Sequence, residues 1–112
     1  MFAVKVTGIE IDRPTEGGQE TAPNLTVTGH VNGPFPDGST ITCQLFNPSS
    51  VTQPTATVSG ISIGPAPDRR WSCQFTGVQP TAQGEQAAVF ASLIGPDGKD
   101  ISPFGPVLFT IL

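Results

Sequence analysis

The sequence predicts an all-β domain in which two antiparallel sheets enclose one core. Three observations carry this prediction. The chain of 112 residues contains 13 glycines and 12 prolines, well above average usage. Its longest segment free of both runs only from Glu85 to Ile94, whereas a helix averages about 11 residues and is interrupted by proline. Apolar residues also recur with the period of two that half-buried strands show. A chain of this length builds one core, so residues 1–112 are expected to form a single domain.

Seven runs alternate apolar and polar residues and are predicted to be strands. The first run, Phe2 to Ile11, places Phe2, Val4 and Val6 on one face and changes parity after Gly8, as a bulge would require. Turn-forming Pro, Gly, Asn and Asp residues separate the runs. The remaining six runs are 25–31, 40–46, 55–63, 69–76, 86–94 and 107–112.

Two of the runs place their largest side chains on one face. In the stretch RRWSCQF the aromatic residues and the thiol alternate with polar residues, and Arg69 and Arg70 stand at its start. A platform for stacking nucleic-acid bases would expose its aromatics between cations, so this pattern favours a buried strand. The side chains expected in the core are Trp71, Cys73 and Phe75, together with Ile41, Cys43 and Leu45.

Three segments need further comment. The run 86–94 is rich in alanine and also fits a short helix, although strand is the favoured interpretation. The run 55–63 slips in parity at Ser59 and Gly60. The segment Asp12 to Pro23 contains several charged and glycine residues, and we expect a mobile loop there.

Charge and hydropathy limit the partners that we expect. The net charge is −4 and the isoelectric point is about 4.6, which disfavours binding to a phosphate backbone. No apolar run approaches the ~18 residues of a membrane span, and the first residues alternate instead of forming the apolar block of a signal peptide. We therefore expect neither nucleic acid nor a membrane as a partner, and assembly in the cytoplasm if Met1 is the true start.

The sequence contains few candidate residues for catalysis or metal binding. The single histidine, His30, lies on the outward face of its run with no catalytic signature around it, so a solvated or interface histidine is the favoured interpretation. The carboxylates Glu10 and Asp12 share a face, and Asp97 and Asp100 share a loop. Either pair could offer oxygens to Ca²⁺, but neither has the spacing of an EF-hand, and solvated turn residues are favoured. We expect a protein that is not an enzyme and needs no cofactor.

The two cysteines, Cys43 and Cys73, stand at inward positions of different strands. They could face each other across the core and form a disulfide. Without a signal peptide the compartment is expected to be reducing, where buried thiols behave as small apolar residues. Both states stay open on the sequence alone. Two cysteines and one histidine in separate strands do not match a familiar zinc site.

The order of motifs resembles a known class of domain. The segments LTVTGHVNG, PDGSTIT, RRWSCQF and GPDGKDIS before a closing VLFTI resemble the single-domain immunoglobulin-like modules of bacterial surface proteins and tailed-phage virions. Seven short strands over about 110 residues are also typical of an immunoglobulin-like sandwich. The likeness covers residues 24–112. The sequence departs from the pattern in its GPAPDRR loop and in its cysteines.

This resemblance implies a passive module rather than a catalyst. A chain that begins with Met and consists of one such domain resembles a phage capsid decoration (cement) or accessory surface protein, bound to capsid or tail subunits on the virion and able to form homo-oligomers. The alternative is an adhesion or spacer module at the bacterial cell surface that binds protein or carbohydrate. The alternative for Phe35, Phe46, Phe90 and Phe104 is that two or three of them complete the core. The residues expected at the interface are Phe35, Phe46, Phe104, Arg69 and Arg70, with Phe90 as a further edge aromatic.

Overall fold

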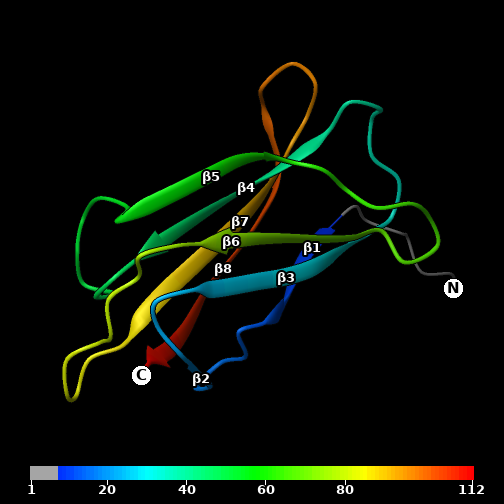
Figure 1. The fold of residues 1–112 in the computed structure, drawn as a ribbon. Helices are drawn as coiled ribbons and strands as arrows, with labels where there is room; N and C mark the ends of the chain where they lie inside the picture. The colour runs from blue at the N-terminus through cyan, green and yellow to red at the C-terminus, as the bar shows by residue number, and fades with distance from the viewer. Residues whose placement is uncertain (1–7) are drawn as a thin grey trace, which may run out of the picture.

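The computed structural model describes residues 8–112 and confirms the all-β prediction (Figure 1). Eight strands form two sheets in this part of the chain, and it contains no helix. The predicted face of Phe2, Val4 and Val6 lies outside the described residues. The strands are β1 (Gly8–Arg13), β2 (Gln19–Glu20), β3 (Leu25–Asn32), β4 (Thr40–Phe46), β5 (Ala56–Ile61), β6 (Arg70–Phe75), β7 (Ala87–Ile94) and β8 (Asp100–Ile111).

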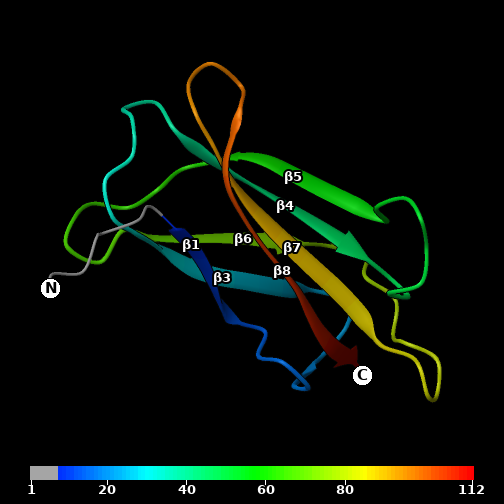
Figure 2. The ribbon, with the colours of Figure 1, turned by 180° about the vertical axis from the view of Figure 1, so that it is seen from behind.

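The two sheets lie as layers with the core between them (Figures 1 and 2). One sheet has three strands in the order β1-β3-β6, and the other has five in the order β2-β8-β7-β4-β5. Every pairing is antiparallel except that of β2 with β8, which is parallel. The prediction of purely antiparallel sheets is therefore wrong at β2. The tip of the β7–β8 hairpin, orange in both views, projects beyond the sheets.

The core follows the predicted alternation. Strand β3 buries every second residue from Leu25 to Val31, and β6 does the same from Trp71 to Phe75. All six side chains expected in the core from the third and fifth runs are at most 8% exposed. This alternation arises because successive side chains of a strand point to opposite faces of its sheet.

The segment from Asp12 to Pro23 is not the mobile loop that we expected. Strand β2 lies within it and pairs with the last strand, so that Gln19 stands opposite Thr110 and Glu20 opposite Ile111. The Gly17 N–H donates to the Leu108 carbonyl at 2.7 Å, and the Leu112 N–H donates to the Glu20 carbonyl at 2.7 Å. These backbone bonds to a strand distant in sequence hold a polar segment in place, and the local sequence carries no sign of them.

Residues 87–94 form a strand, which excludes the helical alternative. Strand β7 is paired with β4 on one side along most of its length and with β8 on the other, where the register shifts between Val89 and Ala91 and between Leu93 and Ile94. The predicted slip in the fourth run is also present. Ile41 pairs with Ile61 and Cys43 with Val58, and Gly60 takes the positive φ of +70° that this bulge requires.

The last strand begins at Asp100 rather than at Val107, and the prediction of its start is wrong. The added segment contains Pro103 and Pro106, which cannot donate to a ladder and argued against a strand in the sequence. The two prolines are tolerated because this part of β8 pairs with a neighbouring strand, β7, on one side only, and its register shifts between Val89 and Ala91. Its other neighbour, β2, reaches only the end of the strand.

Candidate functional site

The outer faces of the two sheets differ in chemistry, and this contrast defines the candidate site. The outer face of the three-stranded sheet, here called the charged face, carries Glu10, Asp12, His30 and Arg70. The outer face of the five-stranded sheet, here called the uncharged face, carries the residues that alternate with the buried ones on β4, β7 and β8. These are Thr42, Gln44, Phe46, Phe90, Ser92, Ile94, Leu108 and Thr110, and Ala88 has the same parity but is only 3% exposed.

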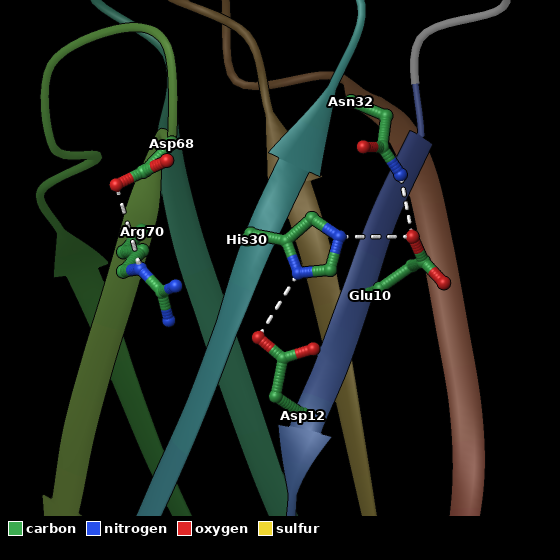
Figure 3. Close-up of polar contacts among 6 residues, drawn as sticks. All are labelled: Glu10, Asp12, His30, Asn32, Asp68 and Arg70. Atoms are coloured by element: carbon green, nitrogen blue, oxygen red, sulfur yellow. Dashed lines mark hydrogen bonds and ion pairs between the residues drawn. The ribbon is translucent and has the colours of Figure 1, made fainter.

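On the charged face, strand pairing brings His30 between two carboxylates (Figure 3). His30 stands opposite Glu10 of β1 and Arg70 of β6 in the register of the sheet. Its Nε2 lies 3.0 Å from Glu10 Oε2, and its Nδ1 lies 2.9 Å from Asp12 Oδ2. Asn32 donates a further hydrogen bond to the same Glu10 oxygen. Two neighbouring strands, β1 and β3, thus assemble one polar cluster, while Arg70 of β6 lies beside it and pairs with Asp68.

The geometry of this cluster favours the charged form of His30. A neutral imidazole has one N–H donor, whereas both ring nitrogens of His30 face a carboxylate oxygen that accepts. The hydrogen bond with Asp12 raises the pKa of His30, partial burial opposes that shift, and the charges of Asp12 and Glu10 raise the pKa further. His30 is therefore an electrostatic cross-link between β1 and β3, and neither of its nitrogens is free to accept a proton from a substrate.

The two carboxylate pairs have different surroundings in the structure. Glu10 and Asp12 are solvated as expected, with side chains 49% and 41% exposed, but they lie on β1 rather than in a turn and both also contact His30. In the β7–β8 hairpin, Asp97 Oδ1 accepts a hydrogen bond from the Lys99 N–H at 3.1 Å, while Asp100 is exposed. Within residues 8–112, no group of three His, Cys, Asp or Glu side chains is placed to hold a metal ion.

The sequence did not predict the partners of His30. Its outward position was expected, but the two carboxylates come from another strand and become neighbours only in the β1–β3 register. The available signal was that β1 and β3 carry polar outward residues at matching positions. That signal requires the pairing of the two strands to be known in advance.

The expected interface residues lie in separate regions. Phe35 and Arg69 come together, with the Arg69 guanidinium carbon 5.5 Å from the centre of the Phe35 ring, and Arg69 also donates to the Gly33 carbonyl. Arg70 projects from the charged face, where it lies 3.9 Å from Asp68, and its side chain is 74% exposed. These two arginines therefore differ. Arg69 is held by contacts within the domain, whereas the exposed side chain of Arg70 is accessible to a binding partner.

The other two expected residues lie on the five-stranded sheet. Phe46 packs edge-to-face against Phe90 on the uncharged face, with ring centres 5.4 Å apart. Phe104 packs partly against the core and lines a surface groove of about 660 Å³ together with Ile11 and Phe90. Sequence reasoning thus identified the aromatics of this sheet, but it did not reveal that a whole face around them lacks charge.

Cys43 and Cys73 are free thiols in this structure and lie within the core. They come from different sheets, Cys43 from β4 and Cys73 from β6, and both belong to one buried core cluster. A side-chain hydrogen bond with Cys73 is the main cause that raises the pKa of Cys43, with burial adding to it, and the same interaction lowers the pKa of Cys73 against the effect of burial. The predicted inward position of both cysteines is confirmed, and their bridging stays a prediction.

Comparison with known proteins adds no assignment. No protein-family model matches the chain, and no curated protein matches it significantly. From Gly8 to Leu112 the structure contains no helix with the length and apolarity needed to cross a membrane.

Proposed function

We propose that this chain is an immunoglobulin-like structural domain, without enzymatic activity, that binds other protein subunits on the surface of a tailed-phage virion. In this role it acts as a capsid decoration or accessory protein. The uncharged face is the observation that carries the proposal. Charged residues are depleted and aromatic residues enriched at the centre of protein interfaces.

The distribution of charge supports this choice of face. The chain has nine acidic and five basic residues, and those between Gly8 and Leu112 lie on the charged face, in loops, in the β1–β2 segment or in the β7–β8 hairpin. The outward side chains on the uncharged face, from Thr42 to Phe46 and from Ala88 to Ser92, contain no ionisable group. An acidic protein can therefore bury the β4 and β7 part of this surface without burying a carboxylate, which would carry a large desolvation cost. Glu16 lies at the β8 edge of the face, where its carboxylate accepts a hydrogen bond from the Leu108 N–H at 3.1 Å.

The order of strands supports an immunoglobulin-like sandwich. In the constant-type form of that fold the first, second, fourth and fifth strands make one sheet, and the third, sixth and seventh make the other. Counting β1 and β2 as one divided first strand, β3 and β6 join β1, whereas β4, β7 and β8 share the second sheet. The fourth strand, β5, departs from this order because it pairs with β4 in the second sheet. The cysteines lie on β4 and β6 rather than on the pair of strands that antibody domains bridge, so the likeness concerns architecture.

The proposal is tested first by locating the protein. Particles and cell envelopes from the source organism are purified, and the chain is quantified by mass spectrometry against the major subunits. We expect a fixed copy ratio to a capsid or tail subunit. Enrichment in the cell envelope without particles would overturn the virion role and support a cell-surface module.

The docking face is tested by a matched pair of double variants. Thr42 and Ser92 face each other across β4 and β7 on the uncharged face, and Thr28 and Ser72 face each other across β3 and β6 on the charged face. Thr42→Lys with Ser92→Lys should weaken particle binding by at least about tenfold, since each added charge must be desolvated at the interface. Thr28→Lys with Ser72→Lys should bind like the unmodified protein. Equal binding by both variants would show that the uncharged face is not the docking surface.

A further inference from the structure

Strand β6 leaves one edge of the three-stranded sheet open. Among the described strands it pairs with β3 alone. On the side away from β3, the Arg70 carbonyl accepts a hydrogen bond from the Gly64 N–H. Because the backbone groups of an antiparallel strand alternate between its two sides, Ser72 and Gln74 direct their N–H and C=O groups to this same side. Within residues 8–112 these groups have no hydrogen-bond partner.

The other edges of the two sheets carry features that oppose the addition of a strand. Strand β1 has a register shift and is followed by Pro14, and β5 has the bulge at Gly60. The first half of β8 contains Pro103 and Pro106, which cannot donate to a ladder. In contrast, β6 contains no proline and pairs with β3 without a register shift. A regular open edge of this kind is a template for a strand from another chain.

The core is least covered along the seam between β5 and β6, which are edge strands of different layers (Figure 1). Ile61, Cys73 and Val78 retain 7–9% exposure, whereas the core side chains of β4 are at most 1% exposed. A hollow of about 570 Å³ lies at one end of the seam, between β6 and residues 61–64. A second hollow of about 180 Å³ lies at the other end, beside Ala56 and Val78. Apolar side chains of an added strand would cover this part of the core.

The first residues of the chain have the pattern that this edge requires. In the stretch FAVKV, the apolar residues Phe2, Val4 and Val6 alternate with Ala3 and Lys5. None of the five is a proline, so each supplies a backbone N–H for a ladder. The alternation predicts a strand with one apolar face, and its length fits the six residues of β6.

We propose that residues 2–6 of one copy of this chain add to β6 of a second copy as a further strand of its three-stranded sheet. Side chains of paired residues lie on the same face of a sheet, so the three apolar side chains of the segment match the three inward side chains of β6. The two intervening residues then lie opposite Ser72 and Gln74 and pair with their free backbone groups. This contact does not use the uncharged face, so it is independent of the proposed function.

The segment cannot make this contact within its own chain. Strand β1 starts at Gly8, and the order β1-β3-β6 places an added strand three strand spacings from β1. That distance is about 14 Å, because neighbouring strands lie ~4.8 Å apart. The three residue steps from Gly8 to Lys5 reach at most about 11 Å. A second copy must therefore supply the strand, and the contact repeats from head to tail into rings or chains.

The unmodified protein provides the first test. Sedimentation velocity over a concentration series should show species larger than the monomer. An excess of the synthetic peptide MFAVKVT should dissociate them, and a peptide of the same composition without the alternation should not. A monomer at every concentration up to about 0.1 mM, or equal effects of the two peptides, would overturn the proposal.

Matched variants of the segment test its register. Val4→Asp places a carboxylate on the inward face, where it would be buried without a partner, and should raise the dissociation constant of the assembly at least about tenfold. Ala3→Asp places the same charge on the outward face and should assemble like the unmodified protein. Equal assembly of the two variants would overturn the proposed register.

Variants of β6 test the accepting edge. Ser72→Pro removes an N–H that faces the added strand and leaves the hydrogen bonds between β6 and β3 in place, so it should weaken assembly at least about tenfold, whereas Ser72→Ala should not. Far-UV circular dichroism checks folding, and Gln74→Pro replaces the first variant if it does not fold. Assembly that is lost in Ser72→Pro but kept in Val4→Asp would show that another strand occupies β6, which overturns the assignment of residues 2–6.

Cross-linking tests the contact directly. In the proposed register Val4 lies beside Cys73, and Cα atoms of paired residues lie about 4.5–5.5 Å apart, within reach of a disulfide. Under mild oxidation Val4→Cys should form a disulfide with Cys73 of another copy, mapped by mass spectrometry of the linked peptides. Ala3→Cys points outward and should not form it. Equal linkage in the two variants, or linkage within one chain, would contradict the proposal.

Discussion

Replacing Gly29 with alanine tests the packing of the three-stranded sheet directly. Gly29 lies in the middle of β3, opposite Ile11 of β1 and Trp71 of β6. A Cβ at this position would lie 2.1 Å from the Glu10 carbonyl oxygen and 2.3 and 2.6 Å from Cζ2 and Cε2 of Trp71. The indole ring therefore fills the space that any side chain at position 29 would need.

The expected loss of stability depends on which atoms the added methyl group must displace. Real Cβ atoms essentially never approach another heavy atom within 3.0 Å, so the Gly29→Ala variant must displace both the β1 backbone and a ring that is 3% exposed. Neither is the free end of a flexible side chain. Overpacking a core costs typically 1–3 kcal/mol, and we expect a loss near the upper end, about 3 kcal/mol. For a domain of this size that loss lowers Tm by roughly 10–20 °C.

A second glycine on the same pair of strands supplies the control. Gly8 pairs with Asn32, and a Cβ added there meets no atom of the other described residues, 9–112, within 4 Å. Gly8→Ala should leave stability within about 1 kcal/mol of the original, because restricting the unfolded chain opposes any loss. Urea unfolding followed by far-UV circular dichroism measures both variants against the unmodified protein. Equal stability of the Gly29→Ala and Gly8→Ala variants would refute the close packing of Trp71 against β3.

Two further predictions concern the ionic contacts. Because the pKa of His30 is raised in the folded state, its contribution to stability is complete below the unfolded pKa of about 6.5 and is lost as pH rises through the folded value. For this reason the urea midpoint of unfolding should fall between about pH 6 and about pH 8.5. His30→Gln should make the midpoint less dependent on pH over this range. An unchanged pH dependence in this variant would contradict the claim that Glu10 and Asp12 stabilise the charged form of His30. Arg13→Gln should destabilise the protein in thermal unfolding, because Glu20 is only 9% exposed and its carboxylate lies 3.0 Å from Arg13 Nε. Arg70→Gln, which removes an exposed contact of 3.9 Å to Asp68, should cause no measurable change, and similar losses in the two variants would show that burial of Glu20 is unimportant.

Local sequence patterns were sufficient to predict the buried side chains, but they did not predict β2 or the first half of β8. The alternation around Trp71 and around Cys43 predicted their burial, because a strand with one face in the core must place alternate side chains inward. The same rule could not find β2, whose two residues have no pattern of their own and are held by backbone bonds to Thr110 and Ile111. It also could not predict the early start of β8, because proline argues against a strand unless one side of that strand is unpaired.

The candidate surfaces show the same division between local and tertiary information. The outward direction of His30 and the presence of Phe46 and Phe90 on outward positions follow from periodicity. Their neighbours follow from register, which places Glu10 beside His30 and Ala88 opposite Phe46. A shift of one residue would exchange the two faces of a strand, so the chemistry of a sheet surface depends on pairing between strands.

The sequence by itself therefore determined the fold class, most of the strands, and the side chains that fill the core, since these depend on periodicity and on turn residues within short segments. The tertiary structure alone decided which residues come together: the carboxylates around His30, the face without charge, and Cys43 and Cys73 in one core cluster. The physical reason is that strand pairing and sheet packing join residues far apart in the chain, and no local pattern records which distant segments will meet.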